Sequence, residues 1–148
     1  MLRALIIAGA ALFLLGLLQG AAVPLFVNPR MALSAHLTAV QSGMAIMIVG
    51  AVWSAVSLGS GLAKAARWTI VLGMYGLWLG LTLSAATGAS EALPIAGAGH
   101  TAAPNMETVV SVIVLGSSGL MTLGWLLFVV GLIRSKRTLD DSIITERL

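Results

Sequence analysis

Hydrophobic residues fill four long runs of the chain, and only short polar segments interrupt them. The runs cover about residues 4–27, 34–58, 68–86 and 109–133. The hydrocarbon core of a bilayer, about 30 Å thick, is crossed by about 20 residues of helix. The pattern therefore predicts four transmembrane helices. The first two connections are short, so consecutive helices should be antiparallel neighbours, whereas the third connection spans about residues 87–107.

Composition supports the same class of protein. Of 148 residues, 59% are hydrophobic and 9% are charged, against about 45–50% and about 25% in soluble domains. We therefore expect an all-α integral membrane four-helix bundle, with residues 1–137 as a single domain. Residues 138–148 should form a short cytoplasmic tail, as a solvated or interfacial helix. The absence of cysteine excludes disulfides, thiolate metal sites and a cysteine nucleophile.

The cations are distributed unequally between the two sides of the predicted membrane. Arg30 alone falls on one side, and the others fall on the opposite side: Arg3, Lys64, Arg67, Arg134, Lys136, Arg137 and Arg147. By the positive-inside rule, both termini should be cytoplasmic and the protein should lie in the inner (cytoplasmic) membrane. Because these cations do not cluster on one face, we expect no nucleic-acid binding.

Polar residues inside the runs are candidates for a functional site, because an unpaired polar group in hydrocarbon is costly. They include Gln19, His36, Gln41, Ser42 and Tyr75. No Asp, Glu, Lys or Arg lies in the middle of a run. This absence argues against proton-coupled transport, including small multidrug exchangers, which depend on a carboxylate in the first span.

His36 lies about one helical turn inside the outer end of the second run. An imidazole at this place can bind a metal or haem iron through one nitrogen while a partner holds the other. It can also be an interfacial histidine bonded to a carbonyl, and position alone favours that simpler interpretation. Gly43 and Met44 lie near the same side of the helix, where the spacing fits either a macrocycle or a helix contact.

Tyr75 and Ser42 lie at comparable depths on two different runs, with Trp78 one turn outward from Tyr75. They can face one cavity, or Tyr75 can be a packing aromatic with a satisfied hydroxyl. The pairs Gly16/Gly20 and Gly76/Gly80 have the spacing that permits close helix approach.

Two motifs carry a resemblance to a known family. Residues 28–37 (NPRMALSAHL), followed by Ser-Gly-Met at 42–44, resemble the hydroxylaminobenzene mutase family, as do residues 93–100 (LPIAGAGH). Tyr75 and Trp78 fall where that family has an aromatic-rich segment. The likeness covers about residues 12–132. A more distant likeness runs to styrene oxide isomerase, in which a histidine is followed six residues later by Asn-Gly-Met.

The resemblance implies a membrane isomerase that rearranges an arylhydroxylamine to an ortho-aminophenol. It further implies a homotrimer that binds haem b between subunits, with His36 as the ligand of the haem iron and ferric haem as a Lewis acid. Tyr75 would move a proton, Ser42 would hold the substrate and Trp78 would stack on its ring. Gly43 and Met44 would line the substrate site. The small aromatic substrate would enter from the lipid bilayer.

Two positions depart from the family pattern. Ser42 stands where both families have an asparagine before Gly-Met, and Leu77 stands where the third helix usually carries another. These changes leave two alternatives on the same scaffold: a haem-binding redox or sensor protein, and a non-enzymatic small membrane protein. The identity of the substrate and the roles of Arg30 and His100 stay open.

Overall fold

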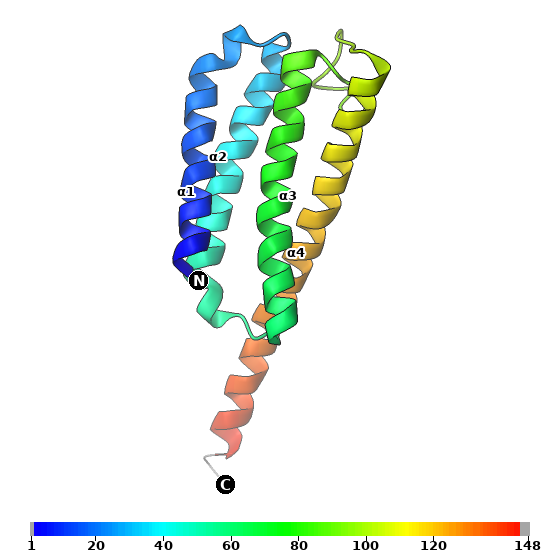
Figure 1. The fold of residues 1–148 in the computed structure, drawn as a ribbon. Helices are drawn as coiled ribbons and strands as arrows, with labels where there is room; N and C mark the ends of the chain where they lie inside the picture. Colours follow the sequence, from blue (N-terminus) through cyan, green and yellow to red (C-terminus); the bar gives the residue numbers. More distant parts are fainter. Residues whose placement is uncertain (1, 146–148) are drawn as a thin grey trace.

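The computed structural model is a bundle of four long helices (Figure 1). It describes the backbone of residues 2–145 and the side chains of residues 3–135. The helices are α1 (Leu2–Ala22), α2 (Pro29–Val52), α3 (Ser60–Thr87) and α4 (Pro104–Thr145). Short 3₁₀ turns, η1 (Val23–Leu25) and η2 (Trp53–Ala55), follow α1 and α2. All four helices are long and apolar enough to cross a membrane, and no strand occurs in the described chain, which confirms the all-helical prediction.

The four helices form two tightly packed pairs. Helix α1 packs mainly on α2 and α4 mainly on α3, and contacts between α2 and α3 join the pairs (Figure 1). The main buried cluster includes Leu12, Ala39, Ile46, Ile70 and Met74. Large apolar side chains are exposed along the outer faces of all four helices. Such an outward apolar surface suits a lipid surrounding rather than water.

Several helix boundaries differ from the limits of the hydrophobic runs. Helix α2 begins at Pro29 rather than 34, because the Asn28 side chain accepts a hydrogen bond from the Met31 N–H and Pro29 fits the first helical position. Helix α3 begins at Ser60 rather than 68, so the expected loop of residues 59–67 is helical from Ser60 onward. Charged side chains end a hydrophobic run without ending a helix, since their heads can reach water along the surface.

The last residues of α1 and α4 also differ from the expected limits. The α-helix of the first run ends at Ala22, before the turn that contains Pro24. Helix α4 continues to Thr145, so its backbone passes through the expected boundary between 137 and 138. Residues 146–148 of the expected tail lie outside the described residues.

Glycines set the distance between the paired helices. A Cβ atom built on Gly43 would lie 2.5 Å from the Phe13 nitrogen and 2.7 Å from the Gly9 carbonyl oxygen. Likewise, a Cβ atom on Gly73 would lie 2.5 Å from the Met121 nitrogen. Gly16 and Gly20 face α2, and Gly76 and Gly80 face α4, as their spacing predicts. Backbones in both pairs therefore meet without side chains between them.

We predict that Gly43→Ala destabilises the bundle by about 1–3 kcal/mol, because the new methyl group meets backbone atoms of α1. The matched control is Gly119→Ala on α4, where a Cβ atom meets nothing within 4 Å. That variant should be neutral or more stable by up to about 1 kcal/mol, from helix propensity. Denaturant titration in detergent measures both. Equal stability of the two variants would contradict the close α1–α2 contact.

Candidate functional site

The imidazole of His36 lies against a notch in α1. Its Nδ1 is 2.7 Å from the Gly16 carbonyl oxygen, and a Cβ atom on Gly20 would lie 2.8 Å from the ring. A carbonyl only accepts, so Nδ1 carries the proton and Nε2 of the neutral ring presents a lone pair. No hydrogen bond to Nε2 occurs within residues 3–135. The glycine notch thus fixes both the position and the tautomer of His36.

The buried side-chain amide of Gln19 connects α1 to α3. It lies in the stretch of α1 that His36 contacts, but it faces α3 rather than α2. Gln19 is 7% exposed. Its Oε1 accepts a hydrogen bond from Trp78 Nε1 at 2.6 Å, and its Nε2 donates to Thr82 Oγ1 at 3.0 Å. Thr82 Oγ1 in turn donates to the Trp78 carbonyl oxygen at 2.8 Å. These bonds hold the Trp78 indole in one orientation.

Tyr75 makes a second connection from α3 to α1. Its hydroxyl donates a hydrogen bond to the Ala8 carbonyl oxygen at 2.8 Å. The Tyr75 and Trp78 rings meet edge to face, with centroids 6.4 Å apart and planes at 87°. The packing interpretation of Tyr75 therefore describes its contacts, while its hydroxyl oxygen keeps lone pairs that can still accept a hydrogen bond.

Ser42 occupies the buried face of α2, between Ala39 and Ile46. Tyr75 and Trp78 pack against the core cluster to which those two neighbours belong. Ser42 is 8% exposed, and its hydroxyl forms no hydrogen bond with any residue that the structure describes. A hydroxyl without a partner, on a largely buried residue, is available to a bound molecule.

The predicted site residues thus fall into two groups. His36 and Trp78 contact the same stretch of α1, residues 16–20, from opposite sides, and Tyr75 adjoins Trp78. Gly43 instead lies in the backbone contact with α1, and Met44 is 43% exposed on the outer face of α2. Leu77, the second position that departs from the family pattern, is half-buried. It packs against two further buried clusters, one around Met31 and Ala85 and one around Ala89 and Val110.

Sequence reasoning assigned no role to Gln19, although it orients Trp78. The available signal was its chemistry, since an amide in a hydrophobic span requires partners. Reasoning also missed Glu107, whose carboxylate accepts hydrogen bonds from the backbone N–H groups of Ser90, Glu91 and Ala102.

The two family-like motifs contact each other at the end of the bundle. Asn28 Nδ2 donates to the Ala96 carbonyl oxygen at 3.2 Å, and the Asn28 N–H donates to the Ala85 carbonyl oxygen at 3.0 Å. In the same loop, Nδ1 of His100 is buried without a hydrogen-bond partner among the described residues. Arg30, two residues after Asn28, is exposed in the first turn of α2. This end of the molecule is therefore organised mainly through backbone groups.

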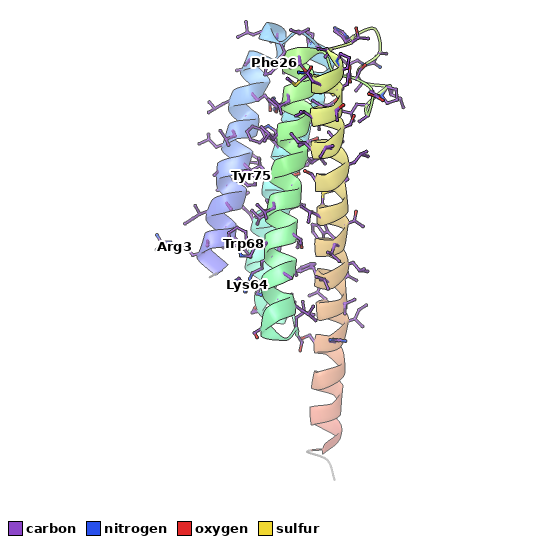
Figure 2. The ribbon with its side chains drawn as sticks, turned by 45° about the vertical axis from the view of Figure 1, so that its right-hand side comes forward. Arg3, Phe26, Lys64, Trp68 and Tyr75 are labelled. Carbon is purple, nitrogen blue, oxygen red and sulfur yellow. The ribbon has the colours of Figure 1, made fainter. Side chains whose placement is uncertain are left out.

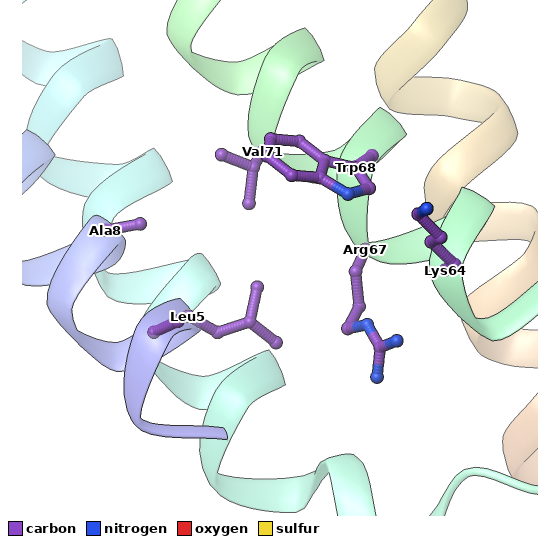
Figure 3. A pocket seen from close by; sticks show the side chains of 7 residues that line it. Leu5, Ala8, Lys64, Arg67, Trp68 and Val71 are labelled. Carbon is purple, nitrogen blue, oxygen red and sulfur yellow. The ribbon is translucent and has the colours of Figure 1, made fainter. Parts of the chain in front are cut away.

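A groove of about 460 Å³ separates α1 from α3 at the opposite end (Figure 3). Lys64, Arg67 and Trp68 lie along its α3 side, and Figure 2 places Lys64, Trp68 and Tyr75 in order along α3. The remaining lining residues are apolar: Ala4, Leu5, Ala8 and Val71. Ala8 also accepts the Tyr75 hydrogen bond, so the groove reaches as far as this contact.

Comparison with known proteins identifies the family. A family model described as styrene oxide isomerase matches residues 1–133. Hydroxylaminobenzene mutase HabB of Ectopseudomonas oleovorans is 43% identical over 110 residues, which cover 74% of this chain and 67% of the relative. Hydroxylaminobenzene mutase HabA of the same organism is 35% identical over 127 residues, which cover 85% of this chain and 94% of the relative. No solved structure matches the chain.

A four-helix membrane bundle with these polar contacts is thus the scaffold of a membrane isomerase. The chain belongs to the styrene oxide isomerase family, and its relatives include hydroxylaminobenzene mutases. This result confirms the resemblance drawn from residues 28–44 and 93–100.

We predict that Gln19→Leu destabilises the bundle by about 1–2 kcal/mol, because the indole N–H of Trp78 loses its acceptor inside the bundle. The indole fluorescence assigned to Trp78, obtained by subtracting the spectrum of the Trp78→Phe variant, should also change. Thr122→Val is the control, since Thr122 is exposed and its hydroxyl donates only to the Ser118 carbonyl oxygen of its own helix. A Trp78 signal that does not change in Gln19→Leu would refute the assigned role of Gln19.

Proposed function

We propose that this isomerase is a mutase that converts an arylhydroxylamine to an ortho-aminophenol. The 43% identity to hydroxylaminobenzene mutase HabB carries the proposal. In the reaction the N–O bond breaks and a C–O bond forms at the ortho carbon. The ring proton on that carbon leaves, and the nitrogen gains a proton. Substrate and product are isomers, so no electron donor is required.

Tyr75 and Trp78 supply the groups that this rearrangement needs. The Tyr75 oxygen can accept a hydrogen bond from the substrate while its own O–H still donates to the Ala8 carbonyl oxygen. Exchange of that bond for one to the substrate lets the hydroxyl deliver or take up a proton. The Trp78 indole, oriented by Gln19, stacks on the aromatic ring. Ser42 has an unpaired hydroxyl with which to hold the polar group of the substrate. Gly43 permits the close α1–α2 approach beside Ser42, and Met44 lines the outer side of the site.

Haem b is the proposed cofactor, with His36 as the ligand of its iron. The lone pair on His36 Nε2, with Nδ1 bonded to the Gly16 carbonyl oxygen, is the arrangement that metal-binding histidines adopt. No group of three His, Cys, Asp or Glu side chains gathers among the described residues, so a bare ion would lack a ligand set here. Haem would bring its own ring nitrogens and would need only one side-chain ligand from the protein. Ferric haem would supply a Lewis acid for the substrate oxygen.

The proposed assembly is a homotrimer in the inner membrane, with both termini cytoplasmic. The bias of the cations supports this orientation. Gln41 supports assembly, because its exposed amide lies among Leu37, Met44 and Ile48 on the outer face of α2. An amide on an apolar outer face is stabilised when it forms a hydrogen bond with a partner on another subunit. The small aromatic substrate would enter this site from the lipid bilayer.

We predict that His36→Ala abolishes haem binding, because the iron loses its only proposed protein ligand in this chain. The visible absorption spectrum of the purified protein, with its Soret band, measures the bound haem. The matched control is His100→Ala, in the loop between α3 and α4. This variant should bind as much haem as the native protein. A His36→Ala protein with unchanged haem content would exclude this assignment.

We further predict that the native protein converts hydroxylaminobenzene to 2-aminophenol without an electron donor. Tyr75→Phe should lower kcat by about 100-fold, the lower range for loss of a positioned acid or base. Its haem content should not change, which separates proton transfer from cofactor binding. An unchanged kcat would remove Tyr75 from the mechanism, and a native protein that produces no aminophenol would refute the proposed reaction.

A further inference from the structure

The groove between α1 and α3 is not explained by the isomerase site. It lies at the end of the bundle where α3 begins (Figure 2), whereas His36 and Trp78 contact residues 16–20 of α1, farther along that helix. Its position raises the question of what occupies it in a membrane. A space of about 460 Å³ lined mainly by apolar side chains is large enough to hold part of a chain molecule rather than water.

The mouth of the groove is cationic. Lys64 is exposed and Arg67 is half-buried, and both line the groove. The Arg67 guanidinium carbon lies 5.2 Å above the centre of the Trp53 ring, which holds it in place without neutralising it. Arg3 belongs to the same end of the bundle (Figure 2).

No carboxylate balances these cations in the described chain. Neither Lys64 nor Arg67 forms an ion pair within residues 3–135. The acidic residues of that range are Glu91 and Glu107, which lie in the loop and helix start at the other end. Two cations that pair with no carboxylate of residues 3–135, next to an apolar groove, are complementary to a molecule with an anionic head and an apolar tail.

The inner part of the groove matches the tail of such a molecule. Leu5 and Ala8 on α1 and Val71 on α3 form apolar walls. From Lys64 to Val71 the helix rises about 10 Å, which accommodates the upper part of an acyl chain. Trp68, 57% exposed, lies at the rim, where indole rings favour the boundary between headgroups and hydrocarbon.

We propose that this groove binds one anionic phospholipid, with its phosphate between Lys64 and Arg67 and an acyl chain along Leu5, Ala8 and Val71. The lipid fills the gap between α1 and α3, which otherwise approach each other at few points. It also occupies the space between the Tyr75–Ala8 hydrogen bond and the end of the bundle where α3 begins. This inference does not depend on the haem or on the reaction catalysed.

The experiment uses the full chain in nanodiscs, with phospholipids that carry bromine atoms on their acyl chains as quenchers of Trp68. The Trp68 signal is the difference between the native protein and Trp68→Phe. Brominated phosphatidylglycerol should quench Trp68 at mole fractions about tenfold lower than brominated phosphatidylcholine, since each interfacial cation strengthens binding to an anionic headgroup. Equal quenching by the two lipids would overturn the proposal.

Three variants locate the site. In Lys64→Gln/Arg67→Gln the preference for the anionic lipid should disappear, and Ala4→Phe should weaken quenching by both lipids because the side chain narrows the groove. Arg30→Gln, at the opposite end of the bundle, is the matched control and should keep the preference. A preference that survives the double substitution, or is lost in Arg30→Gln, would overturn the proposal.

Two further measurements exclude other occupants. Inorganic phosphate and glycerol phosphate should not displace the brominated lipid at concentrations equal to those of the lipid, because they lack the acyl chain. If they do, the site binds phosphate alone and the proposal is wrong. Quenching should also be independent of the protein-to-lipid ratio. If it falls as protein becomes more concentrated, a second copy of this chain covers the groove and the proposal is wrong.

Discussion

The near contact of the α1 and α2 backbones is the constraint on which the rest of the site depends. Gly9 and Gly43 bring the helices together near the middle of α1, and Gly16 and Gly20 continue the contact toward its end. Only at this separation can the His36 ring reach the Gly16 carbonyl oxygen at 2.7 Å. The small residues therefore do more than allow packing, because they determine which imidazole nitrogen is left for another partner.

Hydrogen bonds make a different kind of connection between α1 and α3. Tyr75 and Trp78 reach α1 through a carbonyl oxygen and an amide, whereas glycines let the backbones meet within each helix pair. In a lipid surrounding such groups lack the alternative of bonding to water, so they define the distance between helices that otherwise touch little. Below Tyr75 no such bond occurs in the described chain, and there the groove opens.

Hydrophobic patterning alone was sufficient to predict four helices and their order. It was less accurate about where they begin, because Asn28, Lys64 and Arg67 interrupt a hydrophobic run but suit a helix end or a helix surface. The spacing of Gly16 and Gly20 predicted an interface without its partner, and His36 was left with two interpretations. Both required knowledge of which helix packs against which face, a tertiary property that a single sequence does not encode locally. The same reason explains why Gln19 was given no role and why the groove was missed.

The loop between α3 and α4 is held in shape by hydrogen bonds from a few side chains to its main-chain atoms. The Glu107 carboxylate accepts hydrogen bonds from three backbone N–H groups. The Asn28 side chain donates to the Ala96 carbonyl oxygen, and the Ser90 hydroxyl donates to the His100 carbonyl oxygen. Side chains on its outer surface, such as Ile95 at 81% exposure, take no part in this arrangement. Mutational tolerance should therefore be very uneven here: Ile95 can change freely in evolution, while Asn28 and Glu107, which lie outside the loop, decide whether the loop folds.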